Sequence, residues 1–175
     1  MGPIVYVFLA IGVIIALVGL ARGYNKELGN SIILMFTIAA IGFIELTYEA
    51  QIQAWLQSVL GIANSSLFIY LIYMLTFIAI VFSSYSGIVF IYGGTPISGF
   101  FGQMISLGVG IFNGYLISGT LWYYANRFGY PLVPVELPLP PQTANILNYL
   151  PQTIFPSPVY WVIPATVLLL LRIRG

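Results

Sequence analysis

Long apolar runs alternate with short polar stretches along this chain. Four runs contain about the 20 consecutive apolar residues that a helix needs to cross a bilayer, and a shorter fifth run is interrupted by Pro164. In lipid the backbone polar groups must be satisfied within each segment, so these runs are expected to be helical. The pattern predicts an all-α membrane protein with a bundle of about five transmembrane helices, over residues 3–21, 29–48, 67–92, 102–125 and 155–172.

Two segments between these runs differ from them. Residues 51–63 carry apolar positions at helical spacing with glutamines on the other side, which predicts an amphipathic helix lying in the outer membrane interface. Residues 126–158 contain eight prolines, which exclude a long continuous helix and favour extended or turn-like backbone. Because this Pro-rich loop is also apolar, we expect it to lie over the membrane surface or over a partner.

Small residues recur at every fourth position through the fourth run. On a helix they form one ridge, which consists of Gly102, Ser106, Gly110, Gly114 and Ser118. Small side chains allow a second backbone to approach closely, which is how helices associate in membranes. The pattern predicts a close helix contact along this ridge, with a partner either in this chain or in another one. The first run has a second small face and is a natural neighbour for the ridge.

Composition supports the membrane interpretation. Hydrophobic residues make up 60% of the 175 residues, charged residues 5%, and mean hydropathy is +1.01. Soluble domains carry about a quarter charged residues. We therefore expect a single integral membrane domain over residues 1–175, whose N-terminal run is a retained span and not a cleaved signal.

The residue types also narrow the chemistry. The chain has no Cys and no His, and its four carboxylates are scattered. This excludes thiol chemistry, disulfides, and most zinc, copper and haem sites. A net charge of +1 does not indicate the excess of basic residues that nucleic-acid binding requires. We expect no cofactor, no metal site and no catalytic residues.

The basic residues suggest an orientation. With five spans, Arg22, Lys26, Arg172 and Arg174 lie on one side of the membrane and Arg127 lies on the other. The positive-inside rule then places the C-terminus in the cytoplasm and the N-terminus outside. We expect a prokaryotic cytoplasmic (inner) membrane location.

Three charged residues are expected at the outer ends of two helices. Glu45 and Glu49 are four residues apart on one face, and Arg127 ends the fourth span on the same side. They are interpreted either as a solvated helix end with an ion pair to Arg127, or as a carboxylate pair that binds a cation or relays a proton.

Two segments resemble a known family. Residues 19–28 contain Arg22, Gly23, Tyr24 and Glu27 in the order Gly-x-x-Arg-Gly-aromatic-x-x-Glu, and residues 107–114 are rich in glycine. Both resemble segments of the colicin V production protein family, over roughly residues 3–125. The resemblance implies an inner-membrane protein linked to colicin export and envelope physiology, with no established enzymatic activity. The four motif residues would form a cytoplasmic hairpin of unknown role, or simply a charged turn that sets topology.

These observations favour a non-enzymatic scaffold or accessory protein. Its expected partners are membrane lipid and other membrane-protein subunits or copies of itself. The alternative is a small channel or transporter that uses Glu45 and Glu49 for cation or proton passage. An intramembrane enzyme is disfavoured because serines in the spans have no His or Lys beside them.

Overall fold

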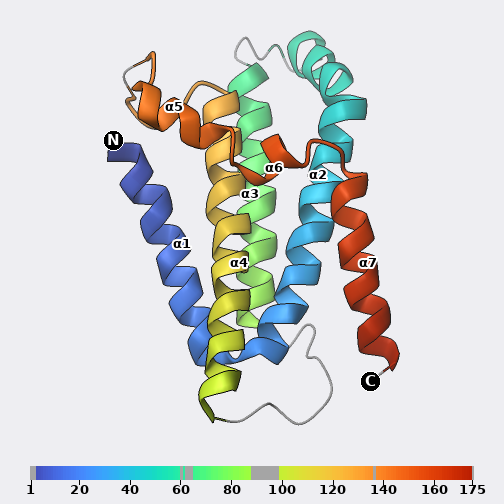
Figure 1. Cartoon of the computed structure of the whole chain (residues 1–175). Coiled ribbons are helices and arrows are strands. Elements are labelled where there is room, and N and C mark those ends of the chain that lie inside the picture. Colours follow the sequence, from blue (N-terminus) through green and yellow to red (C-terminus); the bar gives the residue numbers. More distant parts are fainter. Residues whose placement is uncertain (1–2, 60, 62–64, 88–98, 136, 175) are drawn as a thin grey trace.

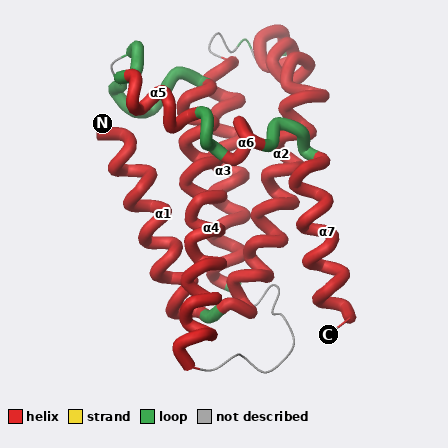
Figure 2. Tube along the Cα trace, viewed as in Figure 1, coloured by secondary structure: helices red, strands yellow, loops and turns green. Residues whose placement is uncertain are grey.

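The computed structural model describes residues 3–59, 61, 65–87, 99–135 and 137–174, and over these ranges it is helical with no strand (Figures 1 and 2). The helices are α1 (Pro3–Arg22), α2 (Tyr24–Ser58), α3 (Ser65–Ser86), α4 (Gly99–Arg127), α5 (Pro141–Leu147), α6 (Pro151–Ile154) and α7 (Val159–Arg174). Helices α1 to α4 are long and apolar enough to cross a membrane. The all-helical class is therefore confirmed, with four helices that could span a membrane. The count of five spans stays a prediction. The expected continuation of the third span over residues 88–92 lies outside the described residues.

Helix α4 is the centre of the bundle. It packs against α1, α2, α3 and α6, whereas α7 packs against the outer side of α2 (Figure 1). The link between α1 and α2 lies at one end of the bundle, which we call the turn end, and α7 also finishes there. Arg127, the last residue of α4, lies at the opposite end.

The contact between α1 and α4 is made by backbone rather than by side chains. A Cβ atom added to Gly110 would lie 2.8 Å from the carbonyl oxygen of Ala16, and one added to Gly19 would lie 2.6 Å from Gly110 Cα. Gly114 abuts the carbonyl of Gly12 in the same way. The structure thus places the partner of the small-residue ridge within this chain, on α1.

Helix α2 is longer than the sequence pattern predicts. Its 35 residues span about 52 Å at 1.5 Å per residue, well beyond a hydrocarbon core of about 30 Å. Residues 51–58 are helical as expected, but they continue α2 and do not form a separate interfacial helix. After Gly42 no glycine or proline interrupts the helix, and Ala, Leu, Gln and Glu favour its continuation. Residues 60, 62 and 63 of the expected interfacial helix lie outside the described ones.

Helix α7 is shorter than the span expected over residues 155–172. It begins at Val159, after Pro156 and Pro158, and its 16 residues extend about 24 Å. It is an apolar helix below the length of the four spans. Whether this fifth segment crosses the membrane stays a prediction.

The Pro-rich segment is more ordered than a loop. It contains α5 and α6, each with a proline in its first turn, where the missing N–H costs nothing. Pro151 of α6 packs into the space left by the absent side chain of Gly119 on α4. Part of this segment therefore packs on α4 of the same chain. The sequence had led us to expect contact with the membrane surface or with a partner.

The α1–α4 contact makes a direct prediction. Gly110→Leu should lower the free energy of unfolding by about 1–3 kcal/mol, because the new side chain meets the α1 backbone, which cannot move aside cheaply. Gly108→Leu is the matched control, since Gly108 is on the same helix, is exposed, and has no atom within 4 Å of an added Cβ. Thermal unfolding in detergent checks both. Equal melting temperatures for the two variants would contradict the contact.

Candidate functional site

Two groups of charged and polar side chains lie along α2. One surrounds Glu27 near the turn end, and the other contains Glu45 and Glu49 near the opposite end. Glu27 and Glu45 are 18 residues apart (45 − 27), or about 27 Å along the helix. We call these groups the Glu27 cluster and the Glu45 cluster. Their separation is close to the thickness of a hydrocarbon core.

A one-residue turn places Glu27 inside the bundle. Helix α1 ends at Arg22 and α2 begins at Tyr24, with only Gly23 between them. Gly23 has a φ of 86°, which a residue with a Cβ atom adopts only at a cost. The sequence predicted a charged hairpin, but the turn is so short that Glu27 already lies in the first turn of α2. Its side chain is fully buried.

Three side chains from three other helices bind the Glu27 carboxylate. Arg22 Nη1 on α1 lies 3.2 Å from Oε1, and Arg22 also stacks on the Tyr85 ring, 4.6 Å from its centroid. The Tyr85 hydroxyl on α3 donates to Oε2 at 2.9 Å. Asn113 Nδ2 on α4 donates to the same oxygen at 2.9 Å. Charge-assisted hydrogen bonds of this kind compensate the burial of an ionised carboxylate.

Amide and hydroxyl groups complete the Glu27 cluster. Asn113 Nδ2 also contacts the Glu27 carbonyl at 2.9 Å, and Ser31 Oγ donates to Asn113 Oδ1 at 2.6 Å. With the Asn30 amide assigned so that both its atoms are satisfied, Oδ1 accepts from Arg22 at 2.7 Å and Nδ2 donates to the Ser84 carbonyl at 3.0 Å. The cluster is therefore a closed hydrogen-bond network that joins α1, α2, α3 and α4.

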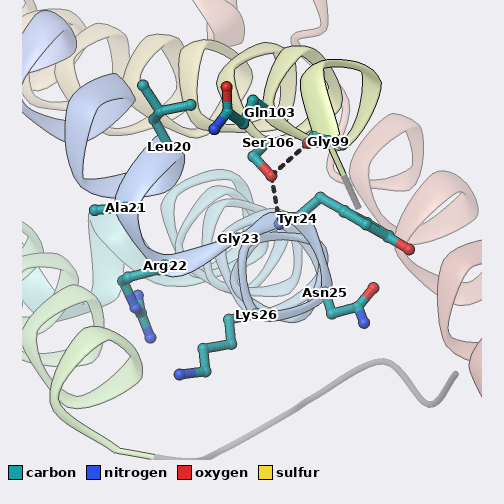
Figure 3. Close-up of a pocket in the computed structure, with 11 residues that line it drawn as sticks. Leu20, Ala21, Arg22, Gly23, Tyr24, Asn25, Lys26, Gly99, Gln103 and Ser106 are labelled. Carbon is teal, nitrogen blue, oxygen red and sulfur yellow. Dashed lines mark hydrogen bonds between the residues drawn. The ribbon is translucent and has the colours of Figure 1, made fainter. Parts of the chain in front are cut away.

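A surface pocket of about 380 Å³ lies over the turn beside this cluster (Figure 3). It is lined by the end of α1 and the starts of α2 and α4, including Arg22, Gly23, Tyr24 and two ridge residues, Gly102 and Ser106. Tyr24 N donates to Ser106 Oγ at 3.0 Å. Because α2 has no side-chain cap of its own at Gly23, Ser106 supplies one from another helix. Motif and ridge thus meet at this turn.

The last ridge residue lies further along the same contact. Ser118 Oγ would lie 3.3 Å from a Cβ added to Gly12, and the hydroxyl donates to the Gly114 carbonyl at 2.8 Å. All five ridge residues consequently lie on the side of α4 that faces α1 or the turn. None of them is left as a free ridge for a partner chain.

The Glu45 cluster brings together the three residues expected at the outer helix ends. Arg127 Nη1 contacts Glu45 Oε1, and Arg127 Nη2 lies 2.9 Å from Glu49 Oε1. The side chains are 30%, 12% and 20% exposed for Arg127, Glu45 and Glu49 respectively, so the group is at the edge of the bundle and not at its surface. One guanidinium therefore bridges two carboxylates.

Tyrosine hydroxyls supply the remaining donors of the Glu45 cluster. Tyr124 donates to Glu45 Oε2 at 2.9 Å, Tyr123 contacts Oε1 at 3.3 Å, and Tyr73 on α3 donates to Glu49 Oε2 at 3.2 Å. These tyrosines were not among the residues predicted from the sequence. The available signal was the spacing of Tyr123 and Tyr124 four and three residues before Arg127, which puts them on the Arg127 side of α4.

The amide and hydroxyl residues of the Glu27 cluster were not predicted from the sequence either. Asn30, Ser31 and Asn113 lie within or beside apolar runs, where an amide or hydroxyl must find a partner. That was a usable signal, but it did not identify the partners. Ser31 and Asn113 are 82 residues apart in sequence, so a local pattern could not pair them. Over the residues that the structure describes, no group of three or more acidic side chains is placed to hold a metal.

No protein-family model, curated protein or solved structure matches this chain.

The contacts of the Glu27 cluster predict that the Arg22–Glu27 ion pair contributes more to the stability of the protein than the Glu27 carboxylate does by itself. Glu27→Gln should lower the free energy of unfolding by about 1–3 kcal/mol, because it leaves Arg22 largely buried without its anion. Adding Arg22→Gln should recover part of that loss, and a double-mutant cycle in detergent measures the coupling. Lys26→Gln, which removes an exposed charge from the same turn, is the control. Additive effects of Arg22→Gln and Glu27→Gln would refute the pairing.

The geometry of the Glu45 cluster predicts that lysine can replace Arg127 only in part. Arg127→Gln should lower the melting temperature, since two carboxylates four residues apart then repel each other without a cation between them. Arg127→Lys should restore only part of the loss, because an ammonium is a single point charge and the guanidinium contacts both carboxylates through separate nitrogens. Full restoration by lysine would show that the bridging geometry is unimportant.

Proposed function

We propose that this protein is a non-enzymatic integral membrane scaffold or accessory subunit. The observation that supports this function is the internal pairing of the charges on its long helices. Glu27, Glu45 and Glu49 are each bound by an arginine of the same chain and by tyrosine hydroxyls. Such pairing stabilises one arrangement of helices, which is what a structural subunit requires.

The lateral surface supports contact with lipid and with other subunits. Leu9 and Val13 on α1 are 56% and 57% exposed, and Ile163 and Leu170 on α7 are 57% and 60% exposed. The Gly/Ser ridge is occupied by α1, so partner contacts in this proposal use the outer faces of α1 and α7. Other subunits or a second copy of the chain would pack there, beside membrane lipid.

The resemblance to the colicin V production family remains part of this proposal. The geometry gives each motif residue a physical role that suits it. Gly23 makes the one-residue turn, Arg22 pairs with Glu27, and the backbone N–H of Tyr24 is capped by Ser106. The roles are structural, in keeping with a scaffold.

The proposed orientation keeps the turn end in the cytoplasm of a prokaryotic inner membrane. Arg22, Lys26 and the end of α7 lie at that end of the bundle, and Arg127 lies at the other. This distribution follows the positive-inside rule. The N-terminus of α1 is then outside.

A second candidate function is cation or proton passage at the Glu45 cluster. One observation favours it: two carboxylates share a single guanidinium, so the three groups carry one net negative charge when all are ionised. A negative site at the outer edge of a bundle would attract a cation. We rank it second because tyrosine hydroxyls already bind both carboxylates.

The scaffold function predicts a defined assembly. Extraction from the source membrane into native nanodiscs, followed by mass determination of the intact particle, should find an oligomer or co-purifying membrane subunits. Val13→Trp and Ile163→Trp, on the outer faces of α1 and α7, should weaken that assembly without unfolding the chain. A lone monomer, together with ion flux in proteoliposomes that Glu45→Gln abolishes, would instead favour the second function.

A further inference from the structure

Among the buried side-chain nitrogen and oxygen atoms that the structure describes, one has no hydrogen-bond partner. It is Oε1 of Gln152, on α6, where the residue is only 8% exposed. The other amide atom, Nε2, donates to Thr120 Oγ1 on α4 at 2.8 Å, which joins α6 to α4. A buried amide oxygen without a donor is unfavourable, and in folded proteins such atoms generally have a protein or water partner.

Gln152 lines a cavity of about 20 Å³ that lies where α2, α4, α6 and the start of α7 meet. Its other polar side chains are Glu45 and Tyr123, and the rest of its wall is apolar or aromatic. A cavity of this size accommodates one water molecule, and an internal water requires two to four polar partners. Gln152, Glu45 and Tyr123 are the polar side chains in its wall, so they are the partners available to such a water.

The geometry of the neighbouring groups leaves room for one more hydrogen-bonding molecule. The contact from the Tyr123 hydroxyl to Glu45 Oε1 is 3.3 Å, which is long for an O–H···O bond, whereas Tyr124 reaches Oε2 at 2.9 Å. Arg127 already contacts Glu45 Oε1, so the unmet requirement in this cavity is a hydrogen-bond donor to Gln152 Oε1. A water molecule is the smallest group that supplies one.

We propose that this cavity binds a single structural water molecule. The water donates one hydrogen bond to Gln152 Oε1 and one to the Glu45 carboxylate. It completes a chain of hydrogen bonds from Thr120 through Gln152 to the Glu45 cluster. The site thus fastens α6 to the charged end of α2, whatever the outcome for the proposed function.

A single methyl group tests the site. Gly42 lines the cavity, and a Cβ added to it would lie 3.5 Å from Pro158 Cγ, so Gly42→Ala fits without a clash. In a helix this change ordinarily raises the melting temperature. Here the methyl displaces the water and leaves Gln152 Oε1 unbonded, so Gly42→Ala should lower the melting temperature of the protein in liposomes. In a Gln152→Leu background the same change should raise it.

The opposite change in melting temperature would contradict the proposal. If Gly42→Ala raises the melting temperature in both backgrounds, no water is held there and the proposal is wrong. Replacing sodium by N-methylglucamine should leave the melting temperature unchanged, and a marked dependence on the small cation would assign the cavity to an ion and overturn the water.

A direct measurement covers the case in which Gln152→Leu fails to fold. Water-edited solid-state NMR of the unaltered chain in liposomes should show rapid magnetisation transfer from water to the Gln152 side-chain amide. The transfer should be strongly reduced in Gly42→Ala. Absence of transfer in the unaltered chain would refute the site without any reference to oligomeric state, so this result is independent of the scaffold proposal.

Discussion

The backbone contact between α1 and α4 is the constraint on which the other packing depends. Gly110 and Gly114 have no side chain to separate them from Ala16 and Gly12, so the helix axes come as close as their backbones allow. Because Gly23 alone joins α1 to α2, the position of α4 on α1 also determines where α2 begins. A bulkier residue in this contact would move Asn113 away from Glu27 as well as α1 away from α4.

At both ends of the bundle, carboxylates on apolar helices are bound by donors from the same chain, but the donors and the degree of burial differ. Near the turn end one carboxylate is fully buried and receives donors from three other helices. Near the opposite end two partly exposed carboxylates share one arginine, and tyrosines fill the remaining positions. Burying a charge without a partner would cost several kcal/mol, so the partners are what allow charged residues on such apolar helices. The charges therefore hold the helices together, because their partners compensate for the cost of burial.

Local pattern predicted those parts of the structure that depend on local chemistry. The apolar runs located four long helices, and the four-residue spacing from Gly102 to Ser118 identified the face that meets α1. Pattern could not show that Glu27 is buried, because its partners Tyr85 and Asn113 are 58 and 86 residues away in sequence. It also misjudged residues 51–58, where amphipathic spacing is equally compatible with an extension of α2. The prolines correctly excluded a long helix. The sequence did not indicate, however, that Pro151 packs against Gly119 on α4.

The five-residue separation of Arg22 and Glu27 has a consequence for biosynthesis. Because the chain is synthesised from its N-terminus, α1, the turn and the start of α2 are made before Tyr85 and Asn113. At that moment the carboxylate can already be neutralised by the arginine across the turn, so the first two helices can leave an insertion channel without an isolated charge. Helices α3 and α4 then replace lipid and water around a pair that already exists. The order of residues along the chain thus matches the order in which the charge has to be sheltered.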